Sequence, residues 1–126
     1  MENDNPGQVR GLVLVVDDDI GVRMVMAAAL EDDGWSVETA ENGRQALDIL
    51  RRVRPDVIVL DLRMPVMDGL DFAERYRESE PAAAPIILVS ATVTEAAARR
   101  SGATAFLRKP TDLTLLLDAV ARVAGG

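Results

Sequence analysis

At 126 residues, the chain is long enough for one domain with a sizeable core and too short for two ordinary domains. Its 21 acidic and 14 basic residues give a net charge of −7, which argues against a dedicated nucleic-acid surface because such a surface is basic. Cysteine and histidine are both absent, which excludes disulfides and thiol chemistry and removes the commonest general base and metal ligand.

The first predicted strand and helix follow a polar amino-terminal segment. Residues 1–10 are mostly polar and include Pro6-Gly7, which predicts a loose tail. The unbroken aliphatic run Leu12–Val16 predicts a buried strand. Ile20–Asp33 is predicted as a helix that stops at Gly34, with four apolar residues near one face: Met24, Ala27, Ala28 and Leu30.

The next two predicted strands enclose a second helix. Trp35–Ala40 alternates in character, which predicts a strand closer to an edge of the sheet. Asn42 suits the N-cap of a helix from Gly43 to about Arg52, whose apolar face consists of Ala46, Leu47 and Leu50. The four aliphatic residues Val57–Leu60 predict a strand that is buried on both faces and is followed by Asp61.

The second half of the chain continues the alternation. Strands are predicted over Ile86–Val89 and Thr104–Leu107, and helices over Leu70–Ser79, Thr94–Ser101 and Asp112–Ala124. The last helix has an apolar stripe at helical spacing, made of Leu113, Leu116, Leu117 and Val120. Five βα units predict an α/β domain over residues 11–124 with a doubly wound, five-stranded parallel sheet, because parallel strands need right-handed crossovers.

Polar side chains follow four of the predicted strands, at Asp17-Asp18, Asp61, Ser90 and Lys109. These positions share one rim of the sheet, the rim at which open α/β sheets bind ligands. If the first and third strands are neighbours, three carboxylates meet there, and they raise one another's pKa unless a cation neutralises them. A hard divalent ion with oxygen ligands fits this set, and Mg²⁺ is the best candidate.

The same rim predicts a site for a phosphoryl group. A metal ion and the Lys109 ammonium would neutralise the phosphoryl oxygens, the Ser90 hydroxyl would donate a hydrogen bond, and the Asp61 carboxylate would attack phosphorus. An ionised carboxylate needs no general base, so the absence of histidine is no obstacle.

Each of these residues also has a purely structural explanation. Asp17–Asp19 would suit the start of the helix at Ile20, because caps and helix dipoles favour acids there. Ser90 would cap the following helix, and Lys109 would be a solvated residue before a turn. These explanations are reasonable singly, but they must be invoked on four strands at the same rim.

Together these residues resemble a known family. Leu14-Val-Val-Asp-Asp18, Asp61-Leu-Arg-Met-Pro65 with Asp68-Gly69, Ser90-Ala91 and Lys109-Pro110 occur in the order typical of the receiver domain of two-component response regulators. The resemblance extends over about residues 10 to 124 and implies a flavodoxin/CheY-like fold.

The resemblance implies roles for the acidic residues. Asp61 would be the phosphoacceptor, taking phosphate from a histidine kinase or a histidine phosphotransfer protein. Asp18, Asp61 and the backbone carbonyl of Arg63 would bind Mg²⁺, and Asp17 would assist through water.

Three further residues have implied roles in the response. Lys109 would pair with the phosphoryl group, and its bond to Pro110 is usually cis in relatives. Ser90 would move toward the phosphate, and Phe106 matches the aromatic switch position that follows it inward. This would shift a pre-existing equilibrium and remodel the face formed by the fourth helix, fifth strand and fifth helix.

Three features depart from the family's pattern. The spacing from Ser90 to Lys109 is about one helical turn short, which predicts a stunted fourth helix. Thr111 stands where an aromatic residue commonly follows Lys-Pro, and Arg108 with Arg99-Arg100 places cations near the output side. These departures bear on partner choice and dimer mode rather than on phosphorylation.

The leading functional hypothesis is a phosphorylatable switch that acts through an unknown downstream protein or relays its phosphate, with self-catalysed phosphorylation and dephosphorylation but no separate substrate. The alternatives are a phosphorylation-independent interaction module, or a receiver taken from a larger regulator. An aspartyl-phosphate phosphatase is disfavoured, because such enzymes usually carry an acid two residues after the nucleophile and position 63 is Arg. No secretory signal or membrane span is evident, so a cytoplasmic monomer or phosphorylation-dependent dimer without direct nucleic-acid binding is expected.

Overall fold

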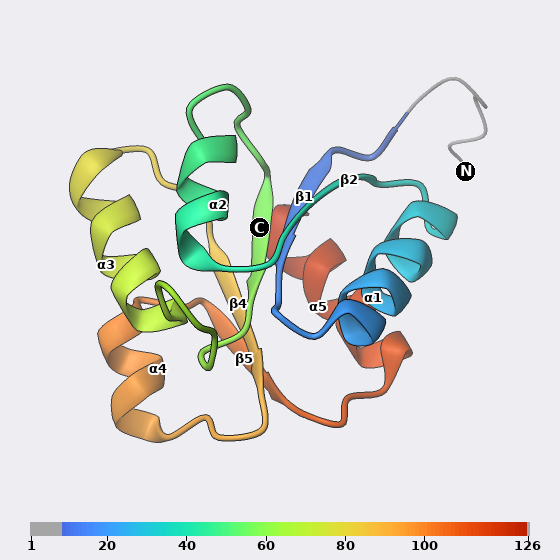
Figure 1. Cartoon of the computed structure of the whole chain (residues 1–126). Coiled ribbons are helices and arrows are strands. Elements are labelled where there is room, and N and C mark those ends of the chain that lie inside the picture. Colours follow the sequence, from blue (N-terminus) through green and yellow to red (C-terminus); the bar gives the residue numbers. More distant parts are fainter. Residues whose placement is uncertain (1–8, 126) are drawn as a thin grey trace.

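The computed structural model describes residues 9–125, which form one five-stranded parallel sheet with helices on both faces (Figure 1). The strands are β1 (Leu12–Val16), β2 (Ser36–Ala40), β3 (Val57–Leu60), β4 (Ile86–Ser90) and β5 (Ala105–Arg108). The helices are α1 (Ile20–Asp32), α2 (Gly43–Ile49), α3 (Gly69–Ser79), α4 (Glu95–Ser101) and α5 (Leu113–Gly125). Residues 1–8 of the predicted tail lie outside the described part of the chain.

All five βα units and the doubly wound parallel sheet are confirmed, and the element boundaries differ by a few residues. The largest difference is that α2 ends at Ile49 rather than near Arg52. The α-helical hydrogen bonding changes there to the spacing of a 3₁₀ turn. The Arg51 amide donates to the Asp48 carbonyl and the Arg52 amide to the Ile49 carbonyl, three residues back instead of four. The expected short fourth helix is seven residues long and is capped by the Thr94 side chain.

The strand order β2-β1-β3-β4-β5 places the rim residues. After β1 the chain crosses to one side to form β2, and after β2 it crosses to the other side to form β3. This reversal opens a crevice at the carboxyl ends of β1 and β3, the usual position of ligand sites in such sheets. Strand β2 is at an edge, as its alternating sequence predicts.

The core has two layers, one on each face of the sheet. Helices α2, α3 and α4 cover one face and α1 and α5 cover the other (Figure 1). Alternate strand residues point to opposite faces, so Leu14 and Ile58 pack toward the first group and Val15 and Val59 toward the second. Both faces of the three central strands are therefore buried, which explains why β1, β3 and β4 read as nearly continuous aliphatic runs, whereas the edge strands β2 and β5 do not.

The face of α1 was predicted wrongly in part. The predicted Leu30 is buried, but the predicted Met24 is 63% exposed, and Met26 is buried in its place in the core layer that α1 and α5 cover. The stripe at i and i+4 faces the sheet, and Met24 lies on the far side of the helix. The sequence could not show this, because α1 is apolar nearly all round and its only charged residue before Glu31 is Arg23.

Among residues 9–125, no helix is both long enough and apolar enough to cross a bilayer.

Candidate functional site

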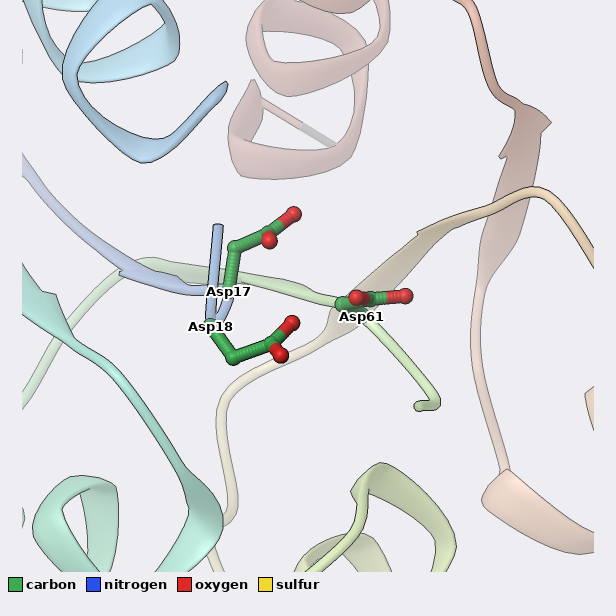
Figure 2. A group of neighbouring side chains, drawn as sticks. All are labelled: Asp17, Asp18 and Asp61. Atoms are coloured by element: carbon green, nitrogen blue, oxygen red, sulfur yellow. The ribbon is translucent and has the colours of Figure 1, made fainter. Parts of the chain in front are cut away.

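Three carboxylates gather at the carboxyl ends of β1 and β3. Asp17, Asp18 and Asp61 each contribute one oxygen to a group whose members all lie within 4.8 Å of one another. Figure 2 shows Asp17 and Asp18, from the loop after β1, beside Asp61 at the end of the neighbouring strand. Asp17 and Asp61 are buried, whereas Asp18 is exposed at the opening. A set of three carboxylate oxygens suits a hard divalent cation such as Mg²⁺.

Backbone hydrogen bonds place two of these acids. The amide of Asp61 donates to the Val16 carbonyl at 2.9 Å, and the amide of Asp17 donates to the Ala40 carbonyl at 3.1 Å. The sheet pairing thus continues one residue past each strand, into the site. The guanidinium of Arg23 on α1 also donates to the Asp17 carbonyl at 2.7 Å and ties the loop to the helix.

Lys109 joins the cluster from the end of β5. Its ammonium Nζ lies 2.7 Å from Asp17 Oδ2 and 3.4 Å from Asp61 Oδ2. Its backbone amide donates to the Ser90 carbonyl at 3.1 Å, and its peptide bond to Pro110 is cis. The lysine is largely buried rather than solvated, so it is the counter-ion of two buried carboxylates.

The environment shifts the titration of both partners. Burial raises the pKa of Asp61, and the nearby charge of Asp17 adds to this, although Lys109 and the Ser90 hydroxyl act in the opposite direction. Burial by itself lowers the pKa of Lys109, but the hydrogen bond to Asp17 and the attraction of Asp61 outweigh it, so this pKa is raised. The site therefore favours the charged form of Lys109, and it disfavours the ionised form of Asp61 beside Asp17.

This shift predicts how metal-free stability depends on pH. Because the pKa of Asp61 is higher in the folded than in the unfolded protein, the folded state binds this proton more tightly, and stability is lost as pH rises through that interval. Asp61→Asn removes the penalty, so the variant should be more stable than the parent at pH 7, and the difference should shrink toward pH 4. Urea denaturation in EDTA over this range measures the difference. A gap that widens on acidification would contradict the assignment.

The remaining predicted residues lie around the cluster. Ser90 is buried at the end of β4, and its Oγ accepts weakly from the Thr92 amide at 3.4 Å. Phe106 is half exposed on the edge strand β5, away from the three acids. Arg63 lies two residues beyond Asp61 in the loop to α3, and its backbone amide lowers the pKa of Asp61.

The structural explanations fail for most of these side chains. The cap of α1 is Asp19, whose Oδ1 accepts from the Val22 amide at 3.0 Å. Asp17 accepts from the Asp19 amide through Oδ1 and pairs with Lys109 through Oδ2, so its role is not confined to the start of α1. The cap of α4 is Thr94 rather than Ser90. The local explanation therefore holds for Asp19, is incomplete for Asp17 and is wrong for Ser90 and Lys109.

Two residues in the segment from Asp61 to the first residue of α3 have backbone roles that were not assigned from the sequence. Gly69 packs against the backbone of Asp61 and Leu62, and its amide donates to the Leu62 carbonyl at 2.9 Å. Val66 adopts a positive φ of 71°, which is rare for a β-branched residue. The Asp68-Gly69 pair in the sequence was a signal for the role of Gly69, but no sequence signal indicated the positive φ of Val66.

Gly69→Ala is expected to destabilise the protein by about 3 kcal/mol, because overpacking against backbone atoms forces a shift in the loop. A Cβ at this position would overlap the Asp61 carbonyl and approach Leu62 Cα. The urea midpoint measures the loss, and Gly125→Ala, whose added Cβ has no neighbour within 4 Å, is the matched control. A change no larger than that of the control would show that the close packing under Asp61 is unimportant.

Comparisons with known proteins agree with this geometry. The family model described as response regulator receiver domain matches residues 13–121. The chain is 43% identical over 108 residues to Response regulator MprA of Mycolicibacterium vanbaalenii, which covers 83% of this chain and 46% of that protein. It is 40% identical over 106 residues to the DNA-binding transcriptional regulator NtrC of Escherichia coli (strain K12), which covers 82% of this chain and 23% of that protein.

Solved structures include similar folds. The chemotaxis response regulator CheY4 of Vibrio cholerae superposes with a TM-score of 0.82 at 36% identity, covering 92% of this chain and 98% of that one. The chain therefore matches that structure over nearly its full length, but it spans only 23% to 46% of the two sequence relatives named above.

Proposed function

This chain belongs to the receiver domain family of two-component response regulators, and on that premise we propose that Asp61 accepts a phosphoryl group from a histidine kinase or a histidine phosphotransfer protein. The observation that supports this most is the contact of one buried ammonium, Lys109, with two buried carboxylates beside an exposed third. A purely structural ion pair would not need Asp18 at the opening. We propose the whole segment 11–124 as the phosphoreceiving unit.

The proposed reaction is an in-line transfer. An Asp61 carboxylate oxygen forms a bond to phosphorus as the bond from phosphorus to the donor imidazole nitrogen breaks, and the imidazole retains the electron pair. The buried site keeps bulk water away from the new acyl phosphate. Lys109 needs only to move its contact from the Asp61 carboxylate to the phosphoryl oxygens, because it already lies between Asp17 and Asp61.

A divalent ion is part of the proposal. Asp18, Asp61 and the backbone carbonyl of Arg63 would hold Mg²⁺, with Asp17 assisting through water, as the gathered oxygens of the three acids suggest. Bound Mg²⁺ would neutralise charge that develops on the phosphoryl oxygens.

The proposed output uses Ser90 and Phe106. Ser90 lies at the end of the strand beside Asp61, and its hydroxyl is close enough to lower the pKa of that carboxyl. A phosphoryl group there would draw the hydroxyl toward it, and Phe106, which is half exposed on β5, would follow inward. The changed surface would then bind a downstream protein, either as a monomer or through a phosphorylation-dependent dimer.

Regulation of transcription, which the name of the NtrC relative states for that protein, would require another segment or partner. The net charge of −7 gives this chain no basic footprint for nucleic acid. We propose that it acts in the cytoplasm.

Incubation with Mg²⁺ and acetyl phosphate tests the proposal. Intact mass spectrometry is expected to show one added phosphoryl group that is stable in acid and labile in base, with spontaneous decay after the donor is removed. Omitting Mg²⁺ should suppress labelling. An unmodified mass with Mg²⁺ present would reject phosphoacceptance and favour a phosphorylation-independent interaction module.

A further inference from the structure

The loop after Asp61 contains an unfavourable turn at its tip. Val66 has φ 71°, and the Met67 amide donates to the Pro65 carbonyl at 2.7 Å across a single residue. This is a γ-turn of the rarer hand, in which the central residue is strained. Val66 is the only non-glycine residue with positive φ among residues 9–125. A β-branched side chain is among the least suited to that conformation.

The turn is imposed by the anchors on either side of it. Met64 and Met67 both insert into the core on the α2 and α3 side of the sheet. The Met67 carbonyl also accepts from the Gly43 amide at 3.0 Å, which fastens the loop to the start of α2. The backbone at position 66 must therefore turn whichever residue is present, and Gly or Asn would adopt the conformation more easily.

The side chain of Val66 gains little packing against residues 9–125 to offset this strain. It is 82% exposed, which makes it the most exposed large apolar side chain among residues 9–125. Valine therefore weakens the fold here by its backbone conformation without strengthening it by packing. A contact outside the chain is the simplest physical reason for an apolar residue at this tip.

The position of the tip indicates which contact. Asp61 is only 6% exposed, so a protein that carries a phosphorylated side chain must approach the rim closely to reach it. Val66 lies five residues beyond Asp61, and Ile20, which is 64% exposed, lies just beyond the loop that carries Asp17 and Asp18. Exposed apolar side chains therefore follow both acid-bearing loops.

We propose that Val66 is a specificity-determining contact for the protein that donates the phosphoryl group to Asp61. This inference rests on the proposed function. The donor would present an apolar surface around its phosphorylated histidine, and Val66 would be buried against that surface during transfer. Acetyl phosphate has no protein surface for Val66 to recognise, so it separates recognition from chemistry.

The test compares two phosphodonors. The protein donor is the phosphorylated protein that labels the parent chain fastest in a panel of purified histidine kinases and histidine phosphotransfer proteins from the source genome. Val66→Asn, Val66→Gly and Val66→Ala are each expected to lower kcat/KM for transfer at least tenfold, while labelling by acetyl phosphate stays within twofold of the parent. Val66→Ile, which keeps an apolar β-branched side chain, should retain transfer.

Control variants distinguish the loss of a side-chain contact at position 66 from the relief of backbone strain there. Val9→Asn alters another exposed valine, 64% accessible, that precedes β1 at the opposite end of the sheet, and it should leave transfer unchanged. Val66→Asn and Val66→Gly relieve the turn and should raise the melting temperature, whereas Val66→Ala keeps much of the strain. Loss of transfer in all three variants supports a contact with the donor.

Several outcomes would overturn the inference. Unchanged transfer to Val66→Asn and Val66→Gly would show that the donor does not touch the tip, and normal transfer to Val66→Ala alone would assign the effect to strain. Labelling by acetyl phosphate but by none of the histidine kinases and histidine phosphotransfer proteins in the panel would also reject it. If acetyl phosphate fails to label the parent chain, the proposed function itself is wrong.

Discussion

Replacing Asp61 by Asn is expected to abolish phosphorylation by acetyl phosphate. The amide has nearly the same shape as the carboxylate, but it is uncharged, is a poor nucleophile and is a weaker ligand for a divalent ion. Intact mass spectrometry after incubation with Mg²⁺ should show the unmodified mass, against one added phosphoryl group for the parent.

The fold should survive this change, so loss of label can be assigned to chemistry. Asp61 is buried beside Asp17, and its ionised form is unfavourable there, as its raised pKa shows. Asp118→Asn is the matched control, because Asp118 is an exposed acid on α5 outside the site. Label that persists in Asp61→Asn would place the acceptor elsewhere, and peptide mapping would locate it.

Lys109→Met is expected to destabilise the metal-free protein by about 3 kcal/mol at pH 7, because removing one partner of a buried ion pair leaves the other charge uncompensated. Here a single ammonium compensates two carboxylates, Asp17 and Asp61. Urea denaturation in EDTA measures the loss. Millimolar Mg²⁺ should restore part of it, since the cation would replace the missing positive charge among the three acids.

The pH dependence distinguishes charge from packing in this variant. If the missing charge is the cause, the loss should be smaller at pH 4, because the raised pKa of Asp61 favours protonation of that carboxylate on acidification. Arg108→Met, at the exposed neighbouring position, controls for removal of a cation that has no ion pair within the described chain. An equal loss at both pH values would assign the effect to the methylene packing of Lys109 instead.

The predictable part of the site consists of residues that directly follow strands. Four polar residues follow aliphatic runs, and parallel strands must present their carboxyl ends at one edge, so convergence of Asp17, Asp61 and Lys109 follows from topology. The sequence could not tell which of the adjacent acids would be buried. The chain direction after β1 decides that: Asp17 turns inward to meet Lys109, and Asp18 faces the opening.

By itself, the sequence determined the five βα units, the two-sided burial of β1, β3 and β4 and the rim that carries the acids. Each of these follows from local composition and from the geometry of parallel strands. The tertiary structure alone decided which side of α1 faces the sheet, because that helix is apolar nearly all round and only packing selects Met26 over Met24. It also decided the conformation of Val66, since the buried Met64 and Met67 impose a turn that valine would not adopt from its own preference.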